Sequence, residues 1–559
     1  MSASVEAIEP AGYEAMLANA DALREAGKRE QAIRGYEAAS AMQPDRVYPL
    51  YWLATLLGEQ REYERAIAYG ERGLALDPDQ IGMLLQMASL ATSTQDTLTA
   101  LERYERARAL DPDIPNIDGF LADQLFRIGR AEDGVAAFDR ALAKEPGSRV
   151  LQTARLFCLN LTETMPPERL ADEHRAWGDR MERSIATLPP RIPAARPRTL
   201  RIGYVSPDLR DHAVSYFVAP LLEHRDRDRF EHVVFDTAGR DDDAISRRLR
   251  ASGVAWHACT SASDDELARL IREREIDVLV DLSGHTAGNR LEVFARKPAP
   301  VQATWLGYLS TTGLTRMDHR LTDALMDPPG MTEHLHTESL VRLPAQACFA
   351  PLGGAPAITA SPARATGAVT FGSLNQWAKV SAPTRDAWGE ILRRNERARL
   401  WIVVRGGQNP RLQRMIEDEF VRRGARAAQI RVFPFLSTQD FLALLGQVDV
   451  ALDPFPYGGG TTTFQCLWMG LPVIALAGRT ALSRNAVGPL TRLGLGDLVA
   501  DTQAGYVEIA DRLGRDVARL ERERLTLRDR MQRSILMDGE AFARSFEAAC
   551  DAMFARACG

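Results

Sequence analysis

The stretch from Asp453 to Gly470 combines glycines and threonines in an order that suits the binding of an anion. Three glycines, Gly458 to Gly460, let a backbone approach a bulky ligand closely, because they lack a Cβ atom. Three threonines, Thr461 to Thr463, then open a predicted helix, whose first N–H groups lack partners at the positive end of the helix dipole. Apolar runs at Val448 to Leu452 and Pro472 to Leu476 predict flanking strands. The stretch therefore predicts a cradle for a diphosphate.

Three further polar clusters follow predicted strands. They are Ser206 to His212, Asp281 to Arg290, and Gly372 to Lys379. In open α/β sheets the chemistry gathers in loops at the carboxyl ends of strands. The three clusters are therefore candidates for the same site as the glycine–threonine stretch.

Within these clusters, four side chains could act on a phosphorylated ligand. Lys379 could neutralise phosphate as a point charge, or it could be a solvated surface lysine. Gln376 could donate hydrogen bonds to the same oxygens. His212 and His285 could work at the site or could be hydrogen-bonded structural histidines, and their spacing leaves both interpretations open.

Short β-rich runs alternate with helical stretches after residue 198, which predicts parallel sheets. A loop rich in Gly, Ala and Pro, Pro351 to Ala368, divides the runs into two series. We expect two doubly wound, Rossmann-like α/β domains, over residues 199–355 and 356–559, with terminal helices in the second and the ligand in the cleft between them. The strand candidates are Leu200–Val205, His232–Phe235, Asp277–Asp281 and Val301–Trp305, then Val369–Ser373, Leu400–Val404, Ile430–Phe433, Val448–Leu452 and Val473–Leu476.

The first 150 residues carry an internal repeat. Pro44, Pro78, Pro112 and Pro146 stand 34 residues apart, and small residues such as alanines keep the same phase. This period is that of tetratricopeptide repeats, which are helix pairs that stack into an all-α solenoid. Residues 1–150 are therefore predicted to form four repeats, which serve either as a groove for a peptide or partner protein or as a scaffold or dimerisation arm. Residues 151–198 are predicted to form a helical cap on the solenoid and a Pro-rich linker.

Composition narrows the class of protein. The chain has 559 residues, 45% of them hydrophobic and 26% charged, with a net charge of −6. These values are typical of an ordered globular protein and give no basic footprint for nucleic acid. No apolar run is long enough for a membrane span, no signal peptide is evident, and the six cysteines lack metal-ligand spacing. We expect a cytoplasmic protein with reduced thiols, no nucleic acid partner and no membrane partner.

Several blocks, in order, resemble the O-GlcNAc transferase family with its plant SPINDLY-type relatives and bacterial homologues. They are Leu200–Asp208 with His212, Lys297–Tyr308, Leu374–Lys379, and the glycine–threonine stretch with Leu467–Pro472. The resemblance covers nearly the whole chain. It implies tetratricopeptide repeats joined to a GT-B catalytic region, in which an inverting, metal-independent enzyme moves a sugar from a nucleotide sugar onto Ser or Thr hydroxyls of proteins without a cofactor.

The resemblance also implies roles for individual residues. Thr461 and Thr462 would hold the diphosphate beside Gln376, and Lys379 would stabilise the leaving group's charge. His212 is the candidate general base, with a diphosphate oxygen or a water relay as competitors. Further nucleotide-sugar-binding positions are Gly460, Leu436, Phe441 and Gln465, and positions near the sugar or acceptor are His257, His285, Gly307 and Tyr457.

Departures from the family pattern leave the donor open. Animal members have an acidic residue for the ribose where this chain has Gln465, and a histidine against the base where Phe441 aligns. UDP-GlcNAc is the first expectation, with binding of UDP, and GDP-fucose or another nucleotide sugar is the alternative. Two other hypotheses remain. One is a transferase that acts on a glycan or small molecule, and the other is a non-catalytic repeat adaptor with a relic transferase region.

Overall fold

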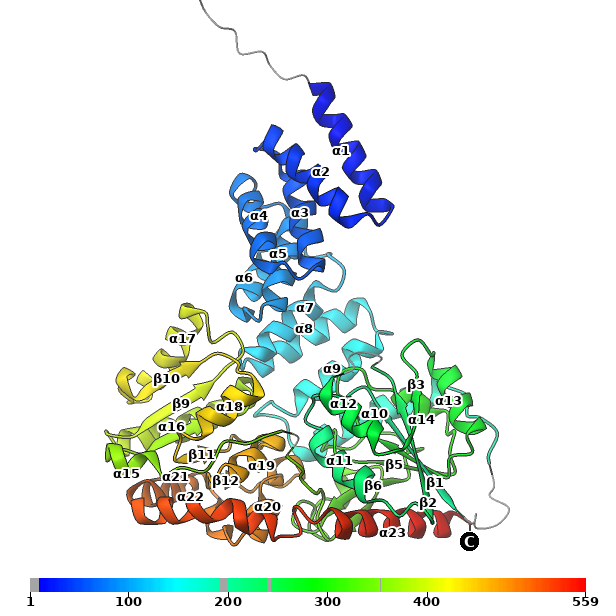
Figure 1. The fold of residues 1–559 in the computed structure, drawn as a ribbon, viewed down its shortest axis with the longest axis vertical. Coiled ribbons are helices and arrows are strands. Elements are labelled where there is room, and N and C mark those ends of the chain that lie inside the picture. Colours follow the sequence, from blue (N-terminus) through cyan, green and yellow to red (C-terminus); the bar gives the residue numbers. More distant parts are fainter. Residues whose placement is uncertain (1–9, 192–198, 239–242, 352, 559) are drawn as a thin grey trace, which may run out of the picture. The chain divides into compact units, whose positions relative to one another are not determined.

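The computed structural model describes residues 10–191, 199–238, 243–351 and 353–558 (Figure 1). These residues form two compact units. One contains the helices up to Pro146 together with Arg405–Gln413. The other contains Gly147–Val404 and the chain from Arg414 onward, and it holds both α/β sheets. In the described part of the chain, no helix is both long enough and apolar enough to cross a membrane.

The first unit consists of four helix pairs, which confirms the predicted tetratricopeptide repeats. Pro44, Pro78, Pro112 and Pro146 each stand two residues beyond the second helix of a pair, where a missing N–H and a fixed φ end the helix. Alanines at the repeated positions, such as Ala54 and Ala88, have no exposed surface and let the helices pack closely. The helices are α1 (Pro10–Glu25), α2 (Arg29–Met42), α3 (Val47–Glu59), α4 (Tyr63–Leu76), α5 (Ile81–Ser93), α6 (Thr97–Leu110), α7 (Ile117–Arg127) and α8 (Ala131–Lys144).

The first α/β domain is built on a parallel sheet of seven strands in the order β3-β2-β1-β4-β5-β6-β7. Leu200 of β1 lies opposite Phe230 of β2, and Ile202 lies opposite Val278 of β4. The strands are β1 (Leu200–Ser206), β2 (Phe230–Asp236), β3 (Ala255–Ala258), β4 (Val278–Asp281), β5 (Val301–Thr304), β6 (His319–Asp323) and β7 (Ser339–Leu343). The helices between them are α11 (Ser215–His224), α12 (Ala244–Ala251), α13 (Asp264–Glu273) and α14 (Leu291–Ala295).

The second α/β domain has a parallel sheet of six strands in the order β10-β9-β8-β11-β12-β13. The strands are β8 (Thr370–Ser373), β9 (Arg399–Val403), β10 (Ile430–Phe433), β11 (Val450–Leu452), β12 (Val473–Leu476) and β13 (Val499–Ala500). The helices are α15 (Pro362–Thr366), α16 (Ala382–Arg394), α17 (Pro410–Val421), α18 (Thr438–Leu445), α19 (Thr461–Trp468), α20 (Val487–Arg492), α21 (Gln503–Arg515) and α22 (Val517–Gln532). Two doubly wound sheets after a repeat array confirm the predicted fold class.

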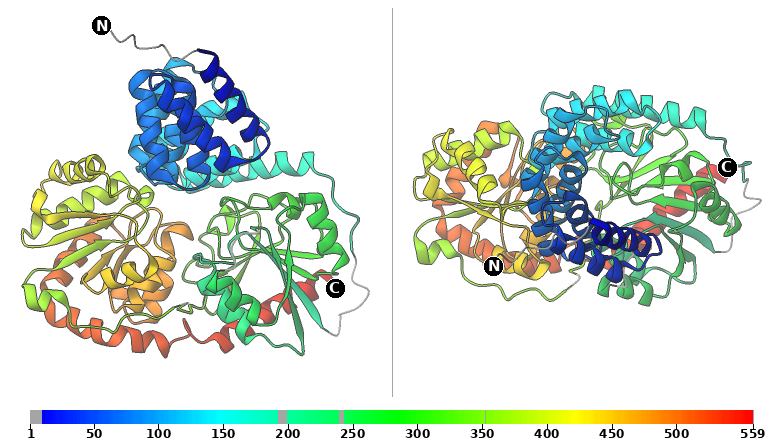
Figure 2. Two further views of the ribbon diagram at one scale, coloured as in Figure 1. Left: turned by 45° about the horizontal axis from the view of Figure 1, so that its top comes forward. Right: turned by 90° about the horizontal axis from the view of Figure 1, so that it is seen from above.

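The last helix, α23 (Gly539–Cys558), lies on the first α/β domain, whereas the sequence led us to expect it in the second (red in Figures 1 and 2). Phe542 and Phe546 enter the core of the first sheet, where they pack on Trp305. Helix α23 lies there because its apolar residues complete the core of this sheet beside α11. Helices α21 and α22 stay with the second domain.

Helices α9 (Arg149–Leu159) and α10 (Pro167–Ser184) belong to the unit of the α/β domains, not to the solenoid that we expected them to cap. His174 of α10 lies 2.7 Å from the Tyr308 hydroxyl, and a Cβ atom on Gly178 would meet the Gly313 carbonyl at 1.9 Å. Such close packing fixes α10 on the first domain. Of the predicted Pro-rich linker, residues 192–198 lie outside the described part of the chain.

Phe546 gives a test of the position of α23. Its side chain is fully buried and 5.0 Å from the Trp305 ring. Phe546→Ala should therefore lower the unfolding free energy of the first domain by about 3–5 kcal/mol through lost burial and a cavity. Denaturant unfolding followed by tryptophan fluorescence measures this change. Leu525→Ala on α22, where the side chain is 54% exposed, is the control and should shift the midpoint little. Equal midpoints for the two variants would contradict the packing.

Candidate functional site

A cavity of about 240 Å³ lies between the two α/β domains, at the carboxyl ends of their strands. Open α/β sheets bind their ligands at this edge. The first domain lines the cavity with His212 and Gly307, and the second contributes Gln376, Lys379, Tyr457, Gly460, Thr461 and Thr462. The structure thus brings eight of the predicted site residues together around one space.

The buried carboxylate of Asp453, just beyond β11, organises the glycine turn. Its Oδ1 atom accepts the Gly459 N–H at 2.7 Å and the side-chain amide of Asn375 at 3.2 Å. A Cβ atom on Gly459 would lie 2.6 Å from Thr463 Oγ1 and 2.8 Å from that carboxylate oxygen. Only glycine therefore fits this position, so the turn keeps its course and brings its backbone to the cavity.

Lys379 supplies the cation of the site from the short turn after β8. Its Nζ donates to the Gly458 carbonyl at 3.2 Å and lies 4.1 Å from the centre of the Tyr457 ring. Burial lowers the pKa of Lys379, and the Asp453 carboxylate opposes that shift. Burial likewise raises the pKa of Asp453, opposed by the Gly459 N–H and by Lys379. An anion in the cavity would restore much of the stabilisation that the lysine's charge loses by leaving water.

Helix α19 begins at the cavity. Gly460 is its N-cap, and no side chain among the described residues caps it there. Thr461 and Thr462 in the first turn are half-buried and line the cavity. The Thr461 hydroxyl also lies 3.5 Å from the Ala213 carbonyl of the first domain, so the helix start spans the gap between the domains. The N–H groups of this turn and the helix dipole favour negative charge at this point.

His212 faces the second domain from the loop that follows β1. Its ring is half-buried, with Nδ1 3.8 Å from the Asp208 carboxylate and 3.4 Å from the Val214 N–H. Burial lowers the pKa of His212, while Asp208 raises it. A neutral imidazole beside a carboxylate can accept a proton from a hydroxyl and be stabilised afterward.

The two other predicted histidines do not line this cavity. His285 is 2% exposed, its Nε2 lies 2.8 Å from the Thr312 carbonyl, and its ring packs 4.5 Å from that of Trp177. Burial holds the pKa of His285 well below its usual value. His257 lies on the edge strand β3 with its ring stacked on Phe235. His285 is thus a hydrogen-bonded core histidine, one of the two interpretations that its spacing left open, and the structure does not bring either histidine to the cavity.

The residues predicted to hold the base and the ribose also lie apart from this cavity. Gln465 lines a neighbouring cavity of about 330 Å³ together with Thr438. Leu436 lies two residues before α18, and Phe441 lies within this helix. Both side chains are half-buried and line neither cavity. One turn of α19 separates Thr461 from Gln465, so this helix runs from one cavity toward the other.

Sequence reasoning missed three polar residues of the cavity wall. Asn375 precedes Gln376 in a cluster that the sequence did single out, and its hydrogen bond to Asp453 marks it as a support of the turn. Asn485 and Gln346 also line the cavity. They come from irregular loops far along the chain, and no motif points to them.

Comparison with known proteins agrees with this geometry. The model of glycosyl transferase family 41 matches residues 187–349 and 361–546, and a tetratricopeptide repeat model matches 17–81 and 85–149. A mutant of the Thermobaculum terrenum O-GlcNAc transferase superposes with a TM-score of 0.83 at 32% identity, covering 92% of this chain and 98% of that one.

Curated relatives match over part of their length. The probable UDP-N-acetylglucosamine–peptide N-acetylglucosaminyltransferase SPINDLY of Oryza sativa subsp. japonica is 35% identical over 434 residues, 76% of this chain and 46% of the relative. The corresponding enzyme of Caenorhabditis elegans is 25% identical over 466 residues, 62% of this chain and 40% of that protein. The chain thus spans about half the length of the curated relatives it matches.

The fold and the cavity define a two-domain protein of the GT-B class preceded by tetratricopeptide repeats. The chain belongs to glycosyl transferase family 41. The resemblance inferred from the sequence blocks is confirmed.

The glycine turn provides a test of the site's construction. Gly459→Ala places a methyl group within 3.0 Å of Thr463, Asp453 and Asn375 side-chain atoms. We expect a loss of about 1–3 kcal/mol in unfolding free energy through overpacking, measured by denaturant unfolding. Gly496→Ala in the same domain is the matched control, because a Cβ atom there has no neighbour within 4 Å. If the two glycine variants were equally stable, the turn would have room that the structure does not show.

Proposed function

We propose that this chain is an inverting, metal-independent glycosyltransferase that moves a sugar, GlcNAc from UDP-GlcNAc in the first instance, onto Ser or Thr hydroxyls of proteins. The observation that carries the proposal is the meeting of Lys379 with the start of α19 at one interdomain cavity. Family membership and the fold of the bacterial O-GlcNAc transferase support it.

The costly feature of such a transfer is the negative charge that grows on the leaving diphosphate. Lys379 places a cation at the cavity, and the first N–H groups and hydroxyls of Thr461 and Thr462 provide donors in fixed positions. Preorganised donors in a partly buried site stabilise such charge without reorganisation. They take the part that a divalent cation plays elsewhere, so the reaction needs neither a metal ion nor another cofactor.

In the proposed reaction, the acceptor hydroxyl oxygen forms a bond to the anomeric carbon of the sugar while the bond from that carbon to the diphosphate breaks. The electron pair leaves with the diphosphate, and a single displacement inverts the carbon. The hydroxyl proton passes to a base. His212, at the first domain's side of the cavity, is our candidate, with a diphosphate oxygen or a water relay as competitors.

The donor's base is the less constrained part of the proposal. Gln465 can hydrogen-bond ribose hydroxyls as an amide, and a phenyl ring such as that of Phe441 stacks on any base. GDP-fucose is therefore the alternative donor. We assign the repeats the role of a groove for the acceptor polypeptide, and the alternative role is a scaffold.

Lys379→Ala tests the catalytic proposal. Removal of the cation should reduce sugar transfer by about a hundredfold or more, since one preorganised donor contributes that much to related reactions. Purified protein is incubated with UDP-GlcNAc or GDP-fucose and lysate proteins, with and without EDTA, and transferred sugar is read by mass spectrometry. Lys28→Ala, at an exposed repeat lysine, is the matched control.

Three outcomes of this experiment would count against the proposal. Normal transfer by Lys379→Ala refutes the role of Lys379, and loss of transfer in EDTA refutes metal independence. If neither UDP nor GDP binds the wild-type protein, the transferase proposal is wrong, and the hypothesis of a non-catalytic repeat adaptor is favoured. Thermal shifts with UDP and GDP distinguish the two bases, because a ligand that binds only the folded state raises stability.

The lowered pKa of Lys379 predicts a pH dependence. As pH rises above 7, Lys379 loses its positive charge earlier than an ordinary lysine, so the affinity for UDP should fall, by about tenfold (about 1.4 kcal/mol) toward pH 9.5. Lys379→Arg keeps its charge throughout this range, because the guanidinium pKa exceeds about 12. Calorimetric titration with UDP should therefore give a flatter profile for the arginine variant. Parallel profiles would show that Lys379 stays charged.

A further inference from the structure

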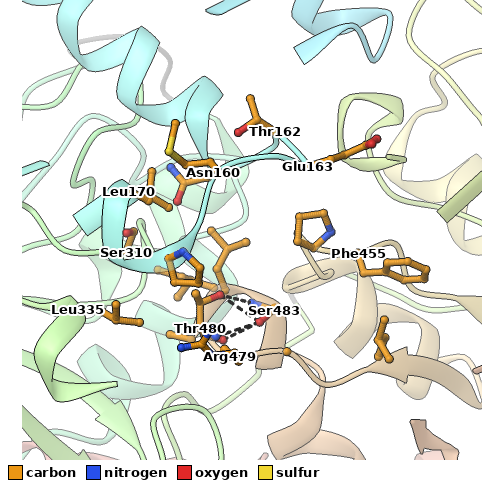
Figure 3. Close-up of a pocket in the computed structure, with 18 of the residues that line it drawn as sticks. Asn160, Thr162, Glu163, Leu170, Ser310, Leu335, Phe455, Arg479, Thr480 and Ser483 are labelled. Atoms are coloured by element: carbon orange, nitrogen blue, oxygen red, sulfur yellow. Dashed lines mark hydrogen bonds between the residues drawn. The ribbon is translucent and has the colours of Figure 1, made fainter. Parts of the chain in front are cut away.

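A second cavity, of about 430 Å³, adjoins the one described above (Figure 3). It lies where the loop between α9 and α10 meets both α/β domains. Leu170 and Leu335 stand on one side of it and Phe455 on the other, with Arg479, Thr480 and Ser483 between them in the lower part of the view. Nothing in the proposed transfer reaction uses this space.

The wall of the second cavity is mostly apolar. Leucine, methionine, proline and alanine side chains from α10, from the loop after β12 and from the turn after β11 contribute to it. Only a few of the lining residues carry a charged side chain. Arg479 is one of them, and its guanidinium pairs with Glu168 at 2.6 Å while the side chain stays 71% exposed. Such a lining, with a volume in the range of ligand pockets, favours an apolar group over a charged one.

Two buried polar side chains in this wall keep an atom without a hydrogen-bond partner in the described part of the chain. Asn160 is 5% exposed, and its amide nitrogen donates to the Leu156 carbonyl and the Tyr308 hydroxyl, while Oδ1 accepts nothing. The His336 side chain is 4% exposed, and its Nδ1 has no hydrogen bond, with Glu338 3.9 Å away. Both atoms are buried from solvent, so they lie within the wall and are not presented to the cavity, which leaves its apolar surface as the feature that a ligand meets.

The second cavity shares a wall with the cavity that contains Lys379 and Thr461, which we call the donor cavity because the proposed reaction places the nucleotide sugar there. Leu309 lines both. In the turn after β11, Phe455 and Pro456 line the second cavity, whereas the next residue, Tyr457, lines the donor cavity. An extended polypeptide advances about 3.3 Å per residue, so the neighbours of a residue held at the donor cavity are within reach of the second one.

We propose that the second cavity binds an apolar side chain of the acceptor polypeptide, a few residues from the hydroxyl that receives the sugar. The proposal rests on the proposed function. A polypeptide that extends from the donor cavity presents the side chains of neighbouring residues at this distance, and the apolar wall suits an apolar one. The cavity thereby selects Ser and Thr sites that have an aliphatic or aromatic neighbour at a fixed distance along the chain.

Acceptor selection by randomised peptides tests the proposal. Peptides with one central Ser or Thr and random flanks are incubated with the wild-type protein and UDP-GlcNAc, and separately with GDP-fucose, and modified products are sequenced by mass spectrometry. We expect apolar residues at one fixed offset to be favoured over alanine by about tenfold or more. Ala477→Phe, which fills the cavity, should remove this preference, and Leu170→Ala, which widens it, should shift the preference to larger side chains.

The outcomes separate the inference from the function on which it rests. A shift toward larger side chains in Leu170→Ala cannot come from misfolding, and Ala251→Phe at an exposed helix end is the control for added bulk. Transfer without an apolar preference, or with a preference that neither cavity variant changes, overturns the inference and leaves the proposed function standing. UDP titration of each variant checks the donor cavity, and absence of transfer to every peptide by the wild-type protein overturns both.

Discussion

The buried carboxylate of Asp453 is the constraint on which the candidate site depends. It fixes the glycine turn through the Gly459 N–H, holds Asn375, and stands beside Lys379. Two segments that the sequence separates by about 80 residues, 375–379 and 453–459, thus meet at one charge. A buried carboxylate is costly unless hydrogen bonds and a cation satisfy it, so the turn and the lysine must take these positions together.

The polar groups of the cleft are likewise divided between the two domains. The first domain places a weakly basic imidazole opposite a cation from the second, and the hydroxyl of Thr461 bridges to Ala213 between them. Each domain therefore supplies only part of the polar lining of the cavity. The side chains are held in place more precisely than on a mobile loop, because the ends of the strands fix the loops that carry them.

The sequence was sufficient for the repeats, the two sheets and the glycine turn that leads into α19, because period, apolar runs and glycine patterns are local signals. It failed for strand β6, where Arg320 and Thr322 are buried and no apolar run exists. Arg320 Nη1 donates to the Tyr308 and Ser310 carbonyls, which only the fold brings near. The sequence left His285 open between the site and the core, because a strand-end position does not tell which of the two a ring faces.

Helix α23 closes the first domain with the last residues of the described chain. The ribosome makes the second domain before it makes α23. Until then, the core of the first sheet is exposed on the side that Phe542 and Phe546 later cover. The two domains therefore mature together, and the ribosome cannot release a finished first half. A cell that interrupts translation within the second domain would be left with an exposed apolar face, a target for chaperones and proteases rather than a half-active enzyme.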